Sequence, residues 1–286
     1  MIDVFCGVGG FSAGGKAVGC NVVLGIDCED SVLRLWAANT GGRGVMATLW
    51  EENIEWPRPC AGVHIHMSPP CTNLSKARAG ATDIDVKTGV NCIQKALDLI
   101  LSQGYRYWSL ENVSTPETRA ILQTYVDANS DKVAYTTVDC ADYGCCTNRV
   151  RLIAGPPTII KRLREMPVRR FSVADAFAAA GQKLPAQYIR NSTRSRSGKP
   201  CIRSVHGAAH TQTASHPLTW CEFDGKTVRC LTVQETSIIQ GFSSGWLLPI
   251  GSRAGIRALG NAVPPPLGSA IMQAACEVKR AETGQS

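Results

Sequence analysis

Two reactive side chains stand just after two strand-like runs of this chain. Cys71 follows Ser68-Pro69-Pro70 and an apolar run at residues 63–67, and Glu111 stands at the close of a second such run. A thiol held by two prolines at one strand end, with a carboxyl at a neighbouring strand end, suits covalent attack on an electron-poor ring whose nitrogen must be protonated. Cytosine is the ring that fits this chemistry best.

Short β-branched runs alternate with helix-length segments up to residue 155, and these elements must position the two side chains. The expected strands are residues 2–5, 22–27, 45–49, 63–67, 105–110, 133–138 and 149–154. The expected helices are residues 30–39, 90–103 and 116–129. This alternation predicts an α/β fold with a doubly wound, mostly parallel sheet, similar to a Rossmann fold.

The alternation stops at Pro156-Pro157, and residues 190–198 form a loop-like run rich in Ser, Arg and Gly. Regular patterning resumes near Leu231 and ends in a helix expected at residues 264–280, which prolines open. We therefore expect a large domain from residues 1–158 and 256–286. Residues 159–255 are expected to form a smaller, irregular domain and a hinge.

The positive charge of the chain is concentrated in one block. Residues 161–203 carry eleven Lys or Arg against Glu165 and Asp175, a net charge of +9 in a chain of net charge +7. Such a block is the electrostatic footprint of a protein that binds a phosphate backbone. A solvated face or a disordered arm is the alternative. Because aromatic residues are sparse in the block, single-strand stacking is not indicated.

The cysteines and the amino-terminal residues bear on compartment and metal. None of the 13 cysteines has C-x-x-C spacing, so no metal site is predicted. Residues 1–5 have no basic leader, and no apolar run of 18 residues exists, so neither a signal peptide nor a membrane span is expected. We expect a reduced, cytoplasmic protein.

A glycine-rich turn, Gly7 to Gly10, follows the first expected strand, and Asp27 ends the second. Backbone amides of such a turn can approach a ligand, and the acidic side chain can accept hydrogen bonds from ribose hydroxyls. The pair indicates a nucleoside-containing cofactor, with a ligand-free tight turn as the alternative. Ser12 occupies the third glycine position of a dinucleotide motif, which disfavours NAD.

Six segments, in this order, resemble the motifs of the DNA (cytosine-5) methyltransferase family of bacteria and phages. They are Asp3-Val4-Phe5-Cys6-Gly7-Val8-Gly9-Gly10, Pro69-Pro70-Cys71, Glu111-Asn112-Val113, Asn148-Arg149-Val150-Arg151, the segment from Arg229 to Phe242, and Gly260-Asn261-Ala262-Val263-Pro264-Pro265. The stretch between Ala154 and Val228 matches none of these motifs. It falls where the family keeps its target recognition domain, and it contains the basic block.

The resemblance implies a DNA (cytosine-5-)-methyltransferase. It would transfer a methyl group from S-adenosyl-L-methionine to C5 of a flipped cytosine in duplex DNA, within a specific sequence, and release S-adenosyl-L-homocysteine. Cys71 would add to C6 of the base, Glu111 would hold a proton at N3, and Arg151 would contact the base carbonyl. The implied catalytic residues are Cys71, Glu111, Asn112, Arg149 and Arg151.

The resemblance and the residue patterns together give the remaining candidate site residues. Cofactor contacts are expected at Phe5, Gly7, Val8, Gly9, Gly10, Asp27, Cys28, Thr48, Leu49, Pro70, Asn261 and Ala262. DNA contacts are expected at Ser75, Lys76, Arg78, Arg194, Arg196 and Thr213. Residues 72–91 have the composition of a mobile loop that could close over DNA.

Some residues depart from the family pattern or keep two interpretations. Thr48, Thr72 and Thr147 replace an acidic residue and two glutamines that are usual in the family. His64 and His66 share one face of the strand before Cys71, where packing or a backbone hydrogen bond is favoured over a role as general base.

A non-catalytic DNA-binding relative and an RNA cytosine-5 methyltransferase remain alternatives. The recognition region has no Cys-Phe-Thr signature of the RNA-modifying relatives. Expected partners are double-stranded DNA and, as one option, a cognate restriction endonuclease. We expect a monomer in the cytoplasm of a bacterial or phage-infected cell. The target sequence is not predicted.

Overall fold

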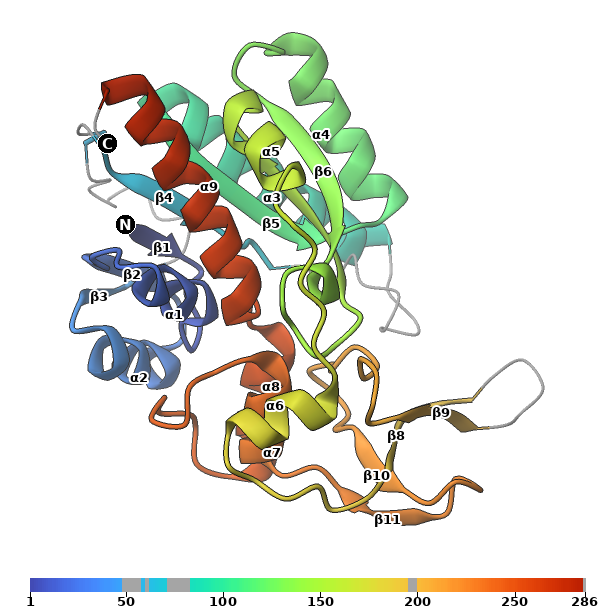
Figure 1. The fold of residues 1–286 in the computed structure, drawn as a ribbon. Helices are drawn as coiled ribbons and strands as arrows, with labels where there is room; N and C mark the ends of the chain where they lie inside the picture. Colours follow the sequence, from blue (N-terminus) through green and yellow to red (C-terminus); the bar gives the residue numbers. More distant parts are fainter. Residues whose placement is uncertain (48–57, 60–61, 71–82, 195–199, 285–286) are drawn as a thin grey trace.

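The computed structural model describes residues 1–47, 58–59, 62–70, 83–194 and 200–284 (Figure 1). Seven strands of these residues form one sheet, in the order β3-β2-β1-β4-β5-β7-β6. The strands are β1 (Ile2–Val4), β2 (Leu24–Asp27), β3 (Arg43–Met46), β4 (His64–Met67), β5 (Tyr107–Val113), β6 (Ala134–Asp139) and β7 (Val150–Gly155). β1 to β5 are parallel, and β7 runs antiparallel to both of its neighbours.

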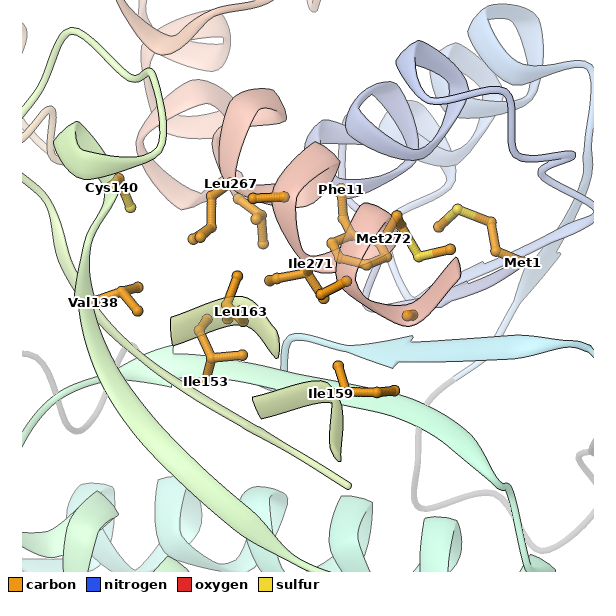
Figure 2. Packing of buried hydrophobic residues seen from close by; sticks show 14 of the residues in the cluster. Met1, Phe11, Val138, Cys140, Ile153, Ile159, Leu163, Leu267, Ile271 and Met272 are labelled. Atoms are coloured by element: carbon orange, nitrogen blue, oxygen red, sulfur yellow. The ribbon is translucent and has the colours of Figure 1, made fainter. Parts of the chain in front are cut away.

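Helices cover both faces of this sheet, each over its own apolar core. On one face, α3 (Asp83–Gln103) and α4 (Pro116–Ala128) pack on residues such as Ile65 and Leu110. On the other face lie α1 (Gly10–Ala17), α2 (Asp30–Thr40), α5 (Pro157–Arg164) and α9 (Pro265–Thr283). Figure 2 shows Phe11, Leu163 and Ile271 meeting in this second core. The predicted α/β fold with a mostly parallel sheet is confirmed.

The close contact of α1 with α9 joins the two ends of the chain. A Cβ atom on Gly14 would lie 2.4 Å from the Pro265 carbonyl oxygen and 2.5 Å from the Ser269 nitrogen. Only glycine lets the two backbones approach this closely, and the Ser269 hydroxyl donates to the Gly14 carbonyl at 3.0 Å. The first and last segments of the chain are therefore held side by side.

A second, antiparallel sheet has the strand order β11-β10-β8-β9. Its strands are β8 (Tyr188–Arg194), β9 (Pro200–Ser204), β10 (Thr219–Cys221) and β11 (Thr227–Cys230). The remaining helices are α6 (Val173–Ala179), α7 (Val233–Gln240) and α8 (Ser252–Asn261), with a short 3₁₀ turn, η1, at Cys140–Asp142. The sheet has its own core with α6 and α7, in which Phe177 meets Trp220 edge to face at 5.5 Å.

One expectation from the sequence is wrong in part. Residues 72–91 were expected to form a loop, yet α3 begins at Asp83; residues 72–82 lie outside the described part. α5 packs on α9 and on β6 and β7, so the first residues of the basic block lie against the large sheet. The division into 1–158 with 256–286 and 159–255 stays a proposal.

His64 and His66 lie on the face of β4 that is turned toward α1, and both are buried. Each has a ring nitrogen within 2.9 Å of the Ser109 hydroxyl, and His66 stacks on Phe11 with a centroid distance of 3.5 Å. A hydroxyl carries one proton, so it can donate to one histidine while it accepts from the other. Burial lowers the pKa of His64 to about 3 and the pKa of His66 well below its ordinary value. The two histidines are therefore held by packing and by hydrogen bonds to the Ser109 side chain rather than to the backbone.

We predict that the free energy of unfolding falls by about 1 kcal/mol per pH unit between about pH 6.5 and pH 5, from three buried groups. Unfolding exposes two histidines that then bind protons in this window. Asp3, whose burial raises its pKa to about 7, gives up its proton on unfolding. The unfolded state thus binds more protons, and stability rises with pH. Urea denaturation across this range measures the slope.

The variant His64→Gln removes one of the two histidine protons taken up, so its slope should be well below that of the wild type. His206 is exposed, and His206→Gln should keep the slope of the wild type. A wild-type protein that becomes more stable toward pH 5 would contradict the predicted proton uptake.

Candidate active site

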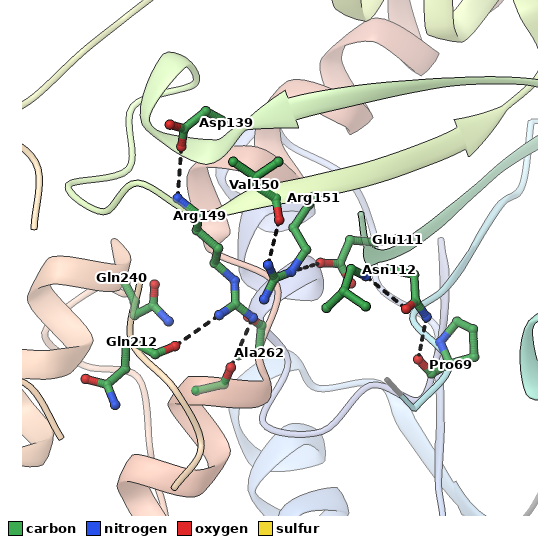
Figure 3. Close-up of polar contacts among 12 residues, drawn as sticks. Pro69, Glu111, Asn112, Asp139, Arg149, Val150, Arg151, Gln212, Gln240 and Ala262 are labelled. Carbon is green, nitrogen blue, oxygen red and sulfur yellow. Dashed lines mark hydrogen bonds and ion pairs between the residues drawn. The ribbon is translucent and has the colours of Figure 1, made fainter. Parts of the chain in front are cut away.

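The carboxyl ends of four parallel strands meet at one edge of the large sheet. The glycine turn follows β1, Asp27 ends β2, the segment Ser68 to Pro70 follows β4, and Glu111 lies near the end of β5. Crevices at this edge are the usual ligand sites of open α/β sheets. The predicted meeting of the two strand ends, after β4 and in β5, is present in the structure (Figure 3).

A pocket opens at this edge, between the strand ends and α8. Its described lining includes these predicted site residues: Phe5, Gly7, Val8, Gly10, Asp27, Cys28, Pro70, Glu111, Arg149, Arg151, Asn261 and Ala262. Gly9 is not part of the described lining, because it faces two indole rings. A Cβ atom on Gly9 would lie 2.8 Å from Trp36 Cδ1 and 3.0 Å from Trp246 Cζ2.

The turn after β1 is shaped by backbone conformations that side chains rarely adopt. Phe5 has φ 60°, Gly7 φ 49° and Gly9 φ 84°. Gly10 is required for a different reason, since its Cβ atom would lie 2.0 Å from the Val263 carbonyl oxygen. A positive φ at the non-glycine Phe5 stores strain at the pocket wall, as is common at ligand sites.

Asp27 braces the glycine turn. Its carboxylate accepts from the Gly7 amide at 2.8 Å and from the Glu29 amide at 3.0 Å. A carboxylate offers about four acceptor positions, so Asp27 keeps capacity for a ligand hydroxyl. The residue predicted to bind a ribose therefore also fixes the loop that would surround it.

Asp3 is a second carboxylate of the pocket, and it is almost fully buried. Its Oδ2 accepts from the Ser12 hydroxyl at 2.5 Å, and Ser12 accepts in turn from the Trp36 indole at 2.9 Å. Oδ1 has no hydrogen-bond partner within the described residues. An orphaned, buried acceptor beside the pocket suits a ligand that brings a donor or a positive charge.

Glu111 and Arg151 form an ion pair inside the pocket. Arg151 Nε lies 2.9 Å from Glu111 Oε1, and the two side chains are 12% and 8% exposed. Residue 151 pairs with Val113 across β5 and β7, which places its side chain beside Glu111. The guanidinium also donates to its neighbouring carbonyl at Val150, at 2.7 Å. Figure 3 shows the Arg151 guanidinium against this carboxyl, and Arg151 also lines the pocket.

Asn112 ties the end of β5 to the segment that precedes Cys71. Its amide nitrogen donates to the Pro69 carbonyl at 2.9 Å, and its oxygen accepts from the Val113 amide at 2.9 Å. Asn112 is buried and does not line the pocket. Its geometry is that of a residue that positions the Pro69-Pro70 turn.

Arg149 is buried, and its guanidinium binds backbone carbonyls from two distant segments. It donates to the carbonyls of Gln212 at 3.1 Å, Gly260 at 3.0 Å and Ala262 at 3.2 Å. The Arg149 amide donates to Asp139 at 2.9 Å. These bonds connect β7 to the loop before β10 and to the end of α8, so Arg149 holds together the walls of the pocket (Figure 3).

Part of the predicted site lies outside the described residues. This part comprises Thr48, Leu49, Cys71, Thr72, Ser75, Lys76, Arg78 and Arg196. Arg194 ends β8. Thr213 accepts from the His216 amide at 3.3 Å, in a loop whose backbone packs against Gly260. Thr147, a departure from the family pattern, is buried.

The sequence patterns predicted Asn261 and Ala262 in the α8 wall of the pocket but missed an ion pair in the same wall. Arg257 of α8 donates to Glu29 at 2.7 Å, and both residues line the pocket beside Asp27. The two residues are 228 positions apart. No local motif predicts such a pairing; the acidic run at Asp27 to Asp30 was the available signal.

No group of three or more His, Cys, Asp or Glu side chains in the described ranges is arranged to hold a metal ion. No helix in the same ranges has the length and apolar character needed to cross a bilayer.

We predict that Arg149→Met lowers the free energy of unfolding by about 3 kcal/mol, because three carbonyls lose a charged donor at once. Urea denaturation at pH 7 measures the loss. Arg34→Met is the matched control: Arg34 is 79% exposed and pairs with Asp30 one turn away, so little change is expected. Equal stabilities for the two variants would contradict the bridging role of Arg149.

Known structures share this fold. A candidate DNA modification methyltransferase encoded within an Escherichia coli prophage matches with TM-score 0.67 and 18% identity, over 96% of this chain and 98% of that one. The Entamoeba histolytica methyltransferase EhMeth matches with TM-score 0.63 and 14% identity, over 97% of both chains. The Schizosaccharomyces pombe Dnmt2 methyltransferase matches with TM-score 0.58 and 12% identity, over 97% and 98%.

A search of curated proteins gave no match. The family model of C-5 cytosine-specific DNA methylases matches residues 1–155 and 159–277, which is most of the chain. The match runs through the glycine turn, the Glu111 and Arg151 pair and the α8 wall of the pocket. The chain belongs to the C-5 cytosine-specific DNA methylase family.

Proposed function

We propose that this protein methylates C5 of cytosine in duplex DNA, within a specific sequence, with S-adenosyl-L-methionine as the donor. The observation that carries the proposal is the Glu111–Arg151 ion pair, which opens onto the same pocket as the glycine turn. The carboxyl that we propose to bind the base and the loop that we propose to bind the cofactor thus line one pocket. The segment that leads to Cys71 borders that cavity at Pro69 and Pro70.

The pocket fits the proposed cofactor. Asp3, Asp27 and Glu29 place carboxylates along one part of the lining, and Asp3 Oδ1 has no partner in the described part of the chain. S-adenosyl-L-methionine carries an ammonium, a sulfonium and ribose hydroxyls that such carboxylates can bind, and it supplies an electrophilic methyl group. Phe5, Gly7 and Asp27 would hold it, together with Ala262 from the far wall.

Cys71 is the proposed nucleophile. Its thiolate would add to C6 of cytosine, which forms a C–S bond and moves electron density to C5. Glu111 would hold the proton at N3 that balances this charge, and Arg151 would keep Glu111 oriented. Once C5 has formed its bond to the methyl group that S-adenosyl-L-methionine would supply, loss of the C5 proton to a base would let the C–S bond break, so that Cys71 leaves as a thiolate and is regenerated.

In the described part of the basic block, some of the cations bind protein groups, so fewer are available to contact DNA than the sequence contains. Several of its arginines bind protein groups: Arg162 pairs with Glu277, Arg170 with Asp142, and Arg203 with Asn148 and the Ala208 and Ala209 carbonyls. We propose that phosphate contact comes mainly from the β8–β9 hairpin. Arg194 is the last residue of β8, and Arg196 lies between the two strands in the sequence. Such contacts would help to offset the cost of flipping a base, a few kcal/mol.

We predict that the purified protein transfers labelled methyl groups to duplex DNA, and that Cys71→Ser lowers the rate by at least about 10³-fold, because a serine hydroxyl is not ionised at neutral pH. Glu111→Gln should lower the rate by about 10²- to 10⁴-fold, since an amide cannot deliver a proton. Radiometric assay of DNA under reducing conditions measures both.

Cys20→Ser is the control for the loss of a thiol, because Cys20 lies beyond α1 and away from the pocket. Equal methylation by the wild type and Cys71→Ser would refute the covalent route. Methylation of RNA but not duplex DNA would identify the substrate as RNA, and no transfer to either would favour a DNA-binding relative without activity. Bisulfite sequencing of DNA from expressing cells would then read the target sequence.

A further inference from the structure

Two cysteines from opposite ends of the sequence lie side by side, away from the pocket. Cys20 follows the end of α1 and Cys276 lies on α9, and their sulfur atoms are 3.9 Å apart. Both residues are half-buried, so small reagents can reach them. The contact sits within the α1–α9 packing that joins the two ends of the chain.

The surroundings make the two thiols unequal. The two sulfur atoms share a hydrogen bond, and the cations of Arg280 and Lys279 lie on the next turn of α9. Together these lower the pKa of Cys276 to about 6, against the opposing effects of burial and of Glu277. The pKa of Cys20 is raised, first by its hydrogen bond to Cys276 and then by burial. The pair therefore favours a thiolate on Cys276 beside a thiol on Cys20, which is the arrangement of a reactive cysteine with a resolving partner.

The geometry points to a peroxide-reactive site: we propose that Cys276 and Cys20 react with hydroperoxides and close to a disulfide that links α9 to the end of α1. This site is separate from the proposed methyl transfer and does not depend on it.

The chemistry is a two-electron oxidation of the pair. The Cys276 thiolate attacks a peroxide oxygen, the O–O bond breaks, and hydroxide leaves, which gives a sulfenic acid on Cys276. The Cys20 sulfur then attacks the Cys276 sulfur, an S–S bond forms, and water leaves with the Cys20 proton. The hydroperoxide is reduced, and the two cysteines are oxidised.

Other described cysteines lack this combination of features. Cys140 and Cys145 interact with each other, but both are fully buried, and the pKa of Cys145 is raised chiefly by that burial. Cys28 and Cys230 are exposed, yet no second sulfur contacts either of them within the described ranges. Cys276 and Cys20 combine partial exposure, contact between two sulfur atoms and cations nearby.

A disulfide at this position would close a loop of nearly the whole chain. Cross-links that close long loops restrict the unfolded state most strongly. The bond would also fix the helix that follows the glycine turn against the helix that follows the last motif. We therefore expect oxidation to raise the temperature of unfolding by several degrees, and a reductant to reverse the rise.

Peroxide treatment of the reduced, full-length protein tests the proposal. After brief exposure to hydrogen peroxide, the remaining thiols are blocked by alkylation, and the unreduced protein is digested for mass spectrometry. We expect a peptide pair that joins Cys20 to Cys276 and disappears on reduction. In Cys20→Ser the sulfenic acid on Cys276 should persist and be trapped by dimedone. Cys230→Ser, which removes an exposed thiol elsewhere, should behave as the wild type.

Three results would overturn the proposal. They are the absence of a Cys20–Cys276 cross-link in protein that remains folded, a dimedone adduct on Cys20 rather than Cys276, and an equal rise in unfolding temperature in Cys20→Ser. Since every readout is a mass or an unfolding temperature, a protein without methyltransferase activity would still give a decision.

Discussion

One buried guanidinium, that of Arg149, connects the parts of this protein that must act together. Its donors bind the carbonyls of Gln212, Gly260 and Ala262, which belong to segments far from β7 in the sequence. A planar group with five donors can satisfy several carbonyls at once, which a lysine could not do in the same geometry. Arg151, which pairs with Glu111, is only two residues beyond Arg149, so its position depends on how Arg149 is anchored. The end of α8, which forms the far wall of the pocket, depends on it too.

The positions of the other site residues follow from the way a parallel sheet brings the carboxyl ends of its strands to one edge. β1, β2, β4 and β5 deliver their carboxyl ends to one edge, so groups that are distant in sequence meet there without long loops. Short polar links then fix each strand end to its neighbour: Gly7 to Asp27, and Asn112 to Pro69. Glycines at positions 10 and 14 let the last motif and α9 approach the first turn and α1 closely. Methyl transfer to cytosine by this family needs a base site and a cofactor site in contact, and we propose that both lie at this edge.

Local sequence patterns predicted the features of the fold that depend on residues close together in the sequence. Alternating strands and helices gave the sheet, and the positions of Glu111 and Asp27 at strand ends followed from the same alternation. Partners that are distant in the sequence were not predicted. The ion pair of Arg257 with Glu29 and the three carbonyl partners of Arg149 arise only when α8 and the loop before β10 dock at the pocket. The start of α3 at Asp83 was missed, because glycines before and within it resemble a loop in composition. The basic block was predicted to be a DNA-binding surface, whereas Arg203 and Arg162 bind groups of the protein itself.

A covalent bond between Cys71 and the target base is the central claim of this account. Duplex DNA in which 5-fluorocytosine replaces cytosine tests it directly, because fluorine at C5 cannot leave as a proton does and the adduct is trapped. The account predicts a denaturation-resistant complex in the presence of S-adenosyl-L-methionine, with the modified peptide carrying the nucleotide on Cys71. A protein that methylates ordinary DNA but forms no such adduct, or forms it on another cysteine, would contradict the account.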